Sequence, residues 1–143
     1  MKVSTKGRYG LRAIIDLSLN SKGDYVSLIS IAERQNISKN YLEQVFSALR
    51  KSGIVKSVKG SQGGYLLNGN TSEIKVGDVL RALEGDLSVV KEDEIANNKI
   101  ELCIKKNIWN KIDEKVFEVI DNITLEDIIN EYNKGNDALM YYI

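Results

Sequence analysis

The amino-acid sequence predicts a mainly helical protein with a small β-hairpin wing, in which a winged helix-turn-helix precedes a long dimerisation helix. Two short segments of helical periodicity flank a tight turn, and the second has an apolar and a polar face. A β-branched, glycine-rich hairpin pattern follows them directly. A long amphipathic segment lies in the last third of the chain. We therefore expect a domain at 1–85, a linker at 86–98, and a dimerisation helix with a C-terminal tail at 99–143.

Composition narrows the classes of protein that this chain can represent. Apolar residues make up 43% and charged residues 28% of the chain, which is typical of soluble globular proteins. No apolar run approaches the ~18 residues of a membrane span, and a signal peptide is missing, so we expect a cytoplasmic protein without membrane contact. The sequence has no histidine and one cysteine, Cys103. We therefore expect no internal disulfide, no metal, no cofactor and no enzymatic activity.

Charge is divided unevenly between the two halves of the chain. Residues 1–68 contain eleven Lys and Arg against four Asp and Glu, whereas residues 69–143 contain nine against sixteen. The N-terminal half is therefore strongly basic although the whole chain has a net charge of +0. This asymmetry indicates that the N-terminal half faces phosphates. The alternative is scatter among surface charges.

The first helix is expected from Thr5 to about Leu19, and Ser4 or Thr5 can cap it. Lys6 and Arg8 then lie in its first turn, where cations oppose the helix dipole. A nearby phosphate would explain them, and so would simple tolerance of charge at a surface. The residues that share the apolar face are Tyr9, Ala13, Ile14 and Leu17.

The helix-turn-helix follows a turn at 21–24. Ser27 caps a short helix that ends near Asn36, and Ser38 caps a second helix at 39–52 that Gly53 closes. The apolar residues of the second helix recur at helical spacing and are Leu42, Val45, Phe46 and Leu49. The residues on its opposite, polar face are Asn40, Glu43, Gln44, Ser47 and Lys51.

A wing is predicted after this second helix. Residues 54–58 are β-branched and alternating, and residues 65–67 can pair with them across a glycine-rich loop at 59–64. The glycines permit close approach of the backbone to a phosphate or to a groove wall. They can also serve the turn alone, but this does not account for Lys56 and Lys59, which flank the loop.

The C-terminal half contains a short helix at 75–83, stopped by Gly85, an acidic connection, and a long helix at about 99–121. The long helix has a broad apolar stripe of Ile108, Trp109, Ile112, Val116, Val119 and Ile120. One winged domain cannot easily cover this stripe, so we expect a partner helix from a second copy. The alternative is packing against its own domain. A last short helix opens at Thr124 with a capping box, before a tyrosine-rich tail at 137–143.

Several motifs in register resemble the CymR/IscR family of bacterial winged-helix regulators. They are MKVSTKGRYG at 1–10, YLEQ at 41–44, LRKSG at 49–53, GGYLL at 63–67, LEG at 83–85 and NITL at 122–125. The resemblance covers the whole chain. It implies a homodimer with two wings and a long C-terminal dimerisation helix, which represses or tunes transcription.

The branch of this family that binds an iron–sulfur cluster has three cysteines and a histidine before and within the long helix. Here the corresponding segment keeps Cys103 alone, and Lys106 stands at the histidine position. Even a dimer supplies two thiolates, so the sequence argues against a cluster. The resemblance is therefore to the cluster-free, CymR-like branch, which regulates cysteine and sulfur metabolism.

Resemblance to this branch also implies a protein partner, the cysteine-synthesising enzyme O-acetylserine sulfhydrylase. That enzyme family accepts the C-terminal isoleucine of serine acetyltransferase in its active site. The partner-binding tail expected here consists of Tyr141, Tyr142 and Ile143. The alternative is that these three residues pack onto the dimer.

We assign the DNA contacts by residue type and position. The phosphate contacts are Ser4, Thr5, Lys6, Arg8, Lys51 and Lys56. The base-reading residues are Ser38, Lys39, Asn40, Glu43 and Gln44. Lys59 enters a minor groove, and the remaining DNA-binding residues are Tyr41, Ser61, Gln62 and Gly63. Two-fold symmetry requires a palindromic double-stranded DNA operator.

Some alternatives stay open. Glu43 either accepts a hydrogen bond from cytosine or forms a surface ion pair with Lys39 or Lys51. Cys103, with Lys99 and Lys106 nearby, is either a thiol switch or an inert small side chain. The rival functions are a redox-responsive regulator of another regulon, a protein-interaction module that uses the winged fold without DNA, and an enzyme.

Overall fold

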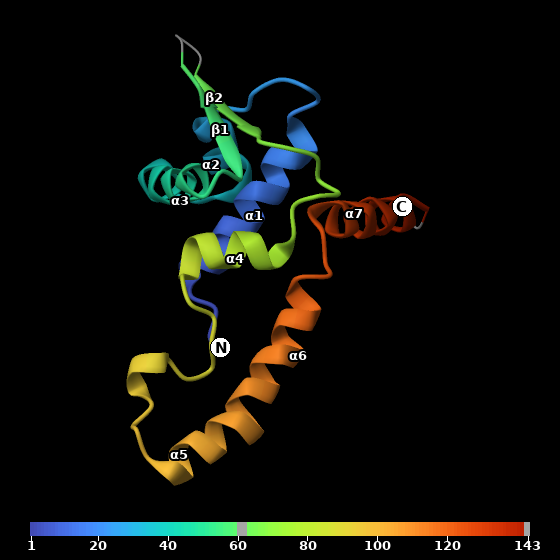
Figure 1. The fold of residues 1–143 in the computed structure, drawn as a ribbon. Coiled ribbons are helices and arrows are strands. Elements are labelled where there is room, and N and C mark those ends of the chain that lie inside the picture. The colour runs from blue at the N-terminus through green and yellow to red at the C-terminus, as the bar shows by residue number, and fades with distance from the viewer. Residues whose placement is uncertain (60–62, 142–143) are drawn as a thin grey trace.

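The structure is a computed structural model that describes residues 1–59 and 63–141, with side chains described up to residue 135. Figure 1 shows a body of helices with a β-hairpin, from which a long helical segment runs away to one side. The helix at the centre of the body is α1 (Thr5–Asn20), close to the predicted range. The elements in contact with it are α2 (Leu28–Gln35), α3 (Lys39–Lys51), α4 (Val76–Glu84), β2 (Gly64–Leu67) and α7 (Leu125–Tyr141).

The predicted helix-turn-helix is present as α2 and α3. Each helix begins as expected, because Ser27 Oγ accepts the N–H of Ser30 at 3.2 Å and Ser38 Oγ accepts the N–H of Tyr41 at 3.1 Å. Asn36 ends α2 in the left-handed region, with a φ of 53°, and its short polar side chain tolerates that conformation. The turn between the two helices therefore follows from the local sequence.

The core of the body lies between α1, α2 and α3. The predicted apolar face of α3 (Leu42, Val45, Phe46 and Leu49) is fully buried, as are Ala13, Ile14 and Leu17 of α1 and Ile31 of α2. The ring of Phe46 lies 4.9 Å from the ring of Tyr65, which fixes the hairpin onto this core. Burial of each large side chain of this kind contributes about 1.5–3 kcal/mol.

The wing consists of β1 (Val55–Val58) and β2, which pair antiparallel with Val55 opposite Leu67 and Val58 opposite Gly64. A Cβ on Gly64 would lie 2.5 Å from the carbonyl oxygen of Val26, so this glycine is required by packing inside the chain. Of the loop residues assigned to DNA, Ser61 and Gln62 lie outside the described residues, whereas Lys59 and Gly63 are exposed.

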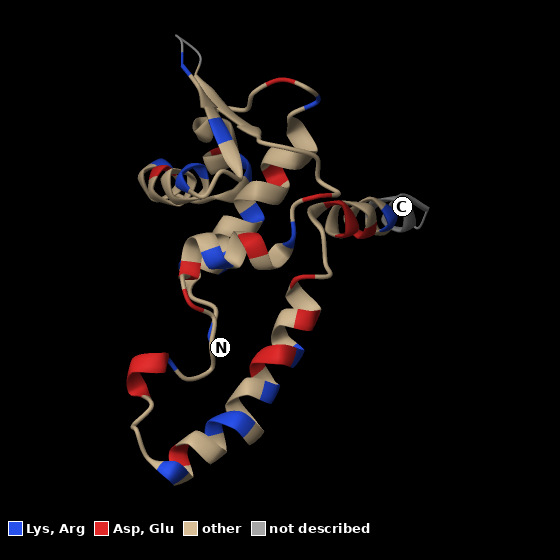
Figure 2. Cartoon of the chain, viewed as in Figure 1, with Lys and Arg blue, Asp and Glu red and all other residues tan. Residues whose placement is uncertain are grey.

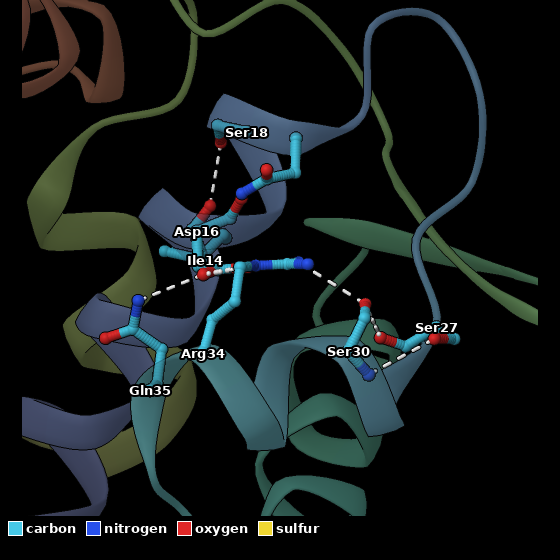
Figure 3. A network of polar contacts seen from close by, with 8 residues as sticks. Ile14, Asp16, Ser18, Ser27, Ser30, Arg34 and Gln35 are labelled. Atoms are coloured by element: carbon cyan, nitrogen blue, oxygen red, sulfur yellow. Dashed lines mark hydrogen bonds and ion pairs between the residues drawn. The ribbon is translucent and has the colours of Figure 1, made fainter.

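A buried carboxylate joins α1 to α2 (Figure 3). Asp16 is 3% exposed, and its oxygens accept three hydrogen bonds from Arg34 at 2.7–3.1 Å and one from Gln35 Nε2 at 2.9 Å. A buried carboxylate is costly unless its oxygens are paired in this way. This network was not predicted from the sequence, and it ties the first two helices together.

The predicted long helix at 99–121 is confirmed as one continuous helical segment. It consists of α5 (Lys99–Ile104), a π-helical stretch η2 (Lys105–Trp109) and α6 (Asn110–Ile120). The π-helical stretch was not predicted. The connection before it contains a short 3₁₀ turn, η1 (Glu92–Glu94), and the N–H of Val89 donates to Asp113 of α6 at 2.9 Å.

The apolar stripe of the long segment has two different environments. At its C-terminal end Ile120 is buried against Leu80 and Leu87, with Val116 packed beside them. Ile120 was predicted to face a partner copy, but it is covered inside its own chain because α4 and the connection reach it. The stripe residues that stay exposed are Ile108 (46%), Ile112 (40%) and Val119 (57%).

Two features hold the C-terminal segments to α4. Arg81 donates to both carboxylate oxygens of Asp121 at 2.7 and 2.9 Å, and the Arg81 guanidinium lies 5.0 Å from the centre of the Phe117 ring. A Cβ on Gly77 would overlap Asp121 Oδ1, so the missing side chain at this position leaves room for the carboxylate where it stands. The hydrogen bonds from Arg81 hold the pKa of the Asp121 carboxyl below its ordinary value.

The last helix, α7, begins with the predicted capping box. Thr124 Oγ1 accepts the N–H of Asp127, and Asp127 Oδ2 accepts the N–H of Thr124, both at 3.0 Å. The helix is longer than predicted, since it continues to Tyr141 and includes part of the expected tail. Tyr142 and Ile143 lie outside the described residues. Among the described helices, none combines the length and the apolar character that a membrane span requires.

We predict that Asp121→Asn lowers the free energy of unfolding at pH 7, because it removes the charged acceptor of Arg81. The pKa of Asp121 in the folded state lies below the ordinary value of 3.8. The ionised carboxylate therefore contributes stability above that value, and the contribution is lost as the pH falls through the folded-state pKa. The difference between wild type and variant should shrink below about pH 4 in urea unfolding curves.

Asp93→Asn is the matched control for this prediction. It removes the same negative charge, but from an exposed position in the short 3₁₀ turn. An equal loss of stability in both variants, or a loss for Asp121→Asn that is independent of pH, contradicts the role given to the Arg81–Asp121 pair.

Candidate nucleic-acid interface

The polar face of α3 borders a shallow groove with the first turn of α1. Its lining brings together five of the residues assigned to DNA from the sequence, namely Lys6, Asn40, Glu43, Gln44 and Lys51. Ser47 and Ala48 complete the floor. Lys6 of α1 thus meets residues of α3 that come 34 or more positions later in the sequence, because α1 and α3 pack through their buried faces. Such a helix face is the element that winged helix-turn-helix proteins place in the major groove.

A second groove lies between the wing and the first residues of α2 and α3. Lys39 lines it together with Ser57, Val58 and Gly63 of the hairpin. The structure thus brings the beginning of α3 beside the loop that contains Lys59, which is exposed at the tip of β1. Lys56 is exposed on β1 itself. Lys56 and Lys59 therefore extend the surface of α3 toward the position that a neighbouring stretch of DNA backbone would occupy.

Glu43 forms an ion pair with Lys39, one turn earlier in α3, at 3.8 Å. Both side chains are about half exposed, at 55% and 52%. A pair of this kind contributes only about 0.3–0.5 kcal/mol, so a base can compete for the carboxylate. The predicted ion pair is therefore present, and it leaves Glu43 available for contact with DNA.

Two tyrosines hold α3 against α1 beside this surface. The rings of Tyr9 and Tyr41 meet edge to face, with centres 5.9 Å apart. Arg8 and Arg12 lie over the Tyr9 ring at 5.6 and 5.1 Å from its centre. Tyr41 was assigned a DNA contact, but the structure places it half-buried between the two helices. Arg12, one turn after Arg8 on the same helix, also donates to the side-chain and backbone oxygens of Gln35 of α2.

The hydroxyl groups at the beginning of α1 already have partners inside the chain. Ser4 Oγ donates to Glu84 Oε1 at 2.6 Å, and Thr5 Oγ1 accepts from Arg8 at 3.3 Å. Ser4 occupies the cap position of α1, but its side chain does not cap the helix. The carboxylate of Glu84 caps the helix instead. Glu84 lies 80 positions from Ser4 in the sequence, so no local pattern could have predicted this contact.

Figure 2 shows how charge is distributed over the described residues. Lysine and arginine outnumber acidic residues on α1, α3 and the hairpin, and also on the part of the long helical segment formed by α5 and η2, whereas acidic residues predominate on α6, α7 and the connection before α5. This agrees with the division of charge in the sequence. The surface around α3 is therefore the part of the molecule that fits a polyanion.

The chain matches the model of the Rrf2 family, described as iron-dependent transcriptional regulators, over residues 3–131. The chain belongs to the Rrf2 family. The transcriptional regulator CymR of Bacillus subtilis (strain 168) is 42% identical over 146 residues, which cover 100% of both chains. IscR of Pectobacterium atrosepticum is 38% identical over 139 residues, which cover 96% of this chain and 85% of that one.

Solved structures of Rrf2 relatives show the same winged-helix fold. CymR of B. subtilis, described as its global cysteine regulator, has a TM-score of 0.78 at 41% identity and covers 92% of this chain and 98% of its own. IscR of T. potens has a TM-score of 0.74 at 44% identity, with 94% and 90% covered. The protein is therefore a DNA-binding transcriptional regulator of the Rrf2 family and not an enzyme.

The iron dependence in the family description does not fit the donor set of this Rrf2 chain. The sequence has one cysteine and no histidine, and Cys103 is exposed on α5. In the described part of the chain, no three Asp, Glu, Cys or His side chains gather in a way that could hold a metal ion. An iron–sulfur cluster held by cysteine thiolates therefore lacks its ligands here.

We predict that Glu43→Ala relaxes base preference. Removal of the acceptor costs about 1–3 kcal/mol of discrimination at one base pair of the operator, so the affinity ratio between cognate and scrambled duplex should fall. Lys51→Ala is the control, because this exposed lysine at the end of α3 is assigned to a phosphate. It should weaken both duplexes equally and reduce the salt slope by about 0.9. If Glu43→Ala changes both affinities by the same factor, the carboxylate does not read a base.

Proposed function

We propose that this Rrf2 protein is a cytoplasmic, homodimeric repressor of genes for cysteine and sulfur metabolism, and that it binds a palindromic operator. Sequence identity alone does not separate this function from that of the IscR relatives, which are similarly identical. The side chains available as metal ligands favour one of the two functions. A chain whose single cysteine is exposed and which has no histidine cannot build the ligand set of a cluster sensor, and this favours the function of CymR.

The exposed part of the long helix supports the dimer. Ile108, Ile112 and Val119 are 40–57% exposed in the single chain, and Ile100 (72%) and Leu102 (47%) extend the apolar surface toward the far end. Apolar side chains this dense on a helix that leaves the body are typical of an interface. A second copy related by a two-fold axis would cover them and place two α3 helices on one duplex.

Genome-wide capture of bound DNA tests which genes this protein regulates. We expect the bound fragments to lie upstream of genes for cysteine synthesis and sulfur uptake, with an inverted repeat at their centre. Fragments that lie instead upstream of iron–sulfur assembly genes, or the lack of a repeat, would falsify the proposal. Capture with Glu43→Ala serves as the control, because its sites should be less selective than those of the wild type.

We also propose O-acetylserine sulfhydrylase as a partner, through Tyr141, Tyr142 and Ile143. Resemblance to the CymR branch supports it, and α7 carries the chain away from α3 and the hairpin (Figure 1). A partner there would leave the DNA surface uncovered. In the same capture experiment, the purified enzyme should change the yield of fragments for the wild type and not for a chain without Ile143. Equal yields for the two chains, with and without enzyme, contradict this partner.

We predict that Ile112→Asp yields a folded monomer. Ile112 is 40% exposed in the single chain, so the aspartate stays hydrated there, whereas a dimer would bury its charge. The dimer dissociation constant should rise at least about tenfold, which corresponds to 1.4 kcal/mol, as measured by sedimentation equilibrium. Glu114→Lys is the control, since Glu114 is exposed and lies two residues further, on the other side of the helix. A dimer of unchanged affinity in Ile112→Asp places the interface elsewhere.

A further inference from the structure

Glu84, the last residue of α4, makes three hydrogen bonds to the beginning of α1. Its Oε1 atom accepts the N–H of Ser4 at 2.9 Å, the hydroxyl of Ser4 at 2.6 Å and the N–H of Gly7 at 3.0 Å. In most helices the side chain of the cap residue accepts the N–H three positions later. Here a carboxylate from another helix takes this role, and its negative charge also lies at the positive end of the α1 dipole.

The sequence of α1 leaves room for this contact. A Cβ on Gly7 would overlap Glu84 Oε1, and a Cβ on Gly10, one turn later, would overlap the side chain of Leu83. Glycine is unfavourable inside a helix, so two of them on the face toward α4 indicate a close approach that the fold requires. The end of α4 is therefore locked against the first turn of α1 by shape as well as by hydrogen bonds.

The turn that Glu84 holds is the one that contains Lys6 and Arg8. Lys6 lines the groove with Asn40 and Gln44 of α3, and Arg8 lies over the Tyr9 ring beside it. The geometry of the first turn decides where both cations stand relative to α3. A first turn that frays moves them away from the surface that α3 presents to DNA.

Helix α4 also holds the long helix. Arg81 lies three residues before Glu84 and binds Asp121 at the end of α6. One helix of nine residues thus connects the long helix to the first turn of α1 through two carboxylates.

We propose that Glu84 is a positioning residue for DNA binding, which holds the first turn of α1 so that Lys6 and Arg8 reach two phosphates. This inference rests on the phosphate contacts proposed for Lys6 and Arg8. It opposes the simplest electrostatic expectation, because removal of an acid beside phosphates should strengthen DNA binding. Positioning requires the reverse result, and the two are separable by experiment.

The experiment measures the affinity of the full chain for an operator duplex at several salt concentrations, with thermal unfolding to verify that each variant is folded. Glu84→Ala should weaken binding about tenfold and reduce the salt slope by about 0.9–1.8, the loss of one or two phosphate contacts. Glu84→Gln should retain most of the affinity, because its amide oxygen still accepts hydrogen bonds although the charge is gone. Glu114→Ala removes the same charge from an exposed site on α6 and should not weaken binding.

Two further variants keep the proposal testable if Glu84→Ala is unstable. Gly7→Ala disrupts the contact between Glu84 and the first turn by a change in α1 instead of α4, and it should weaken DNA binding in the same way. In a double-mutant cycle, Lys6→Ala should cost less affinity in the Gly7→Ala background than in the wild type, since the misplaced turn has already weakened that contact.

The outcomes separate this inference from the proposed contacts. If Lys6→Ala and Arg8→Ala leave both affinity and salt slope unchanged, the phosphate contacts themselves are wrong. If those two variants weaken binding but Glu84→Ala and Gly7→Ala bind as tightly as the wild type, or more tightly, the positioning role is overturned. Additive effects in the cycle overturn it as well, because they mean that Glu84 acts independently of Lys6.

Discussion

The close approach of α1 and α4 is the constraint on which the rest of the structure depends. Helix α1 contacts both helices of the helix-turn-helix as well as α4, β2 and α7, so these elements are placed relative to it. Gly7 and Gly10 allow the side chains of Glu84 and Leu83 of α4 to lie against the backbone of α1. The C-terminal half then follows, because Leu80 of α4 is the apolar residue against which Leu87 and Ile120 pack. A bulky side chain at either glycine would therefore shift both halves of the molecule relative to each other.

Two guanidinium–carboxylate pairs complement the contact between α1 and α4. They lie where apolar packing alone would not fix the orientation of one helix on another. Arg34 with Asp16 fixes α2 on α1, and Arg81 with Asp121 fixes the end of α6 on α4. Apolar contact is roughly indifferent to a rotation of a few degrees, whereas a two-point hydrogen-bonded pair is not. The pairs therefore contribute orientation where the cores contribute most of the free energy. Both carboxylates also lie between elements, where a rotation would have most effect on the DNA surface.

Local features of the fold were predictable from the sequence, and long-range ones were not. Ser27, Ser38 and the Thr124–Asp127 capping box are signals of a few residues, and the structure confirms each of them. The polar face of α3 was predictable as well, because amphipathic periodicity decides which side chains face outward, and the structure adds that Lys6 lies beside it. The contact between Glu84 and Ser4 spans 80 positions, and no spacing rule connects such residues. For the same reason Ile120 was assigned to a partner copy although its own chain buries it.

The π-helical stretch at Lys105–Trp109 changes how the long helix can meet another helix. Each residue of a π-helix turns the chain by a smaller angle than in an α-helix, so the phase of the side chains shifts across these five residues. Cys103 and Ile112 lie on either side of the shift, and the angle expected between them for a uniform α-helix does not apply. A change of period along a helix locally unwinds or overwinds a supercoil that contains it. In the proposed dimer, two copies of this helix would therefore change their winding at the stretch, and the pattern of contacts before it would not continue unchanged after it.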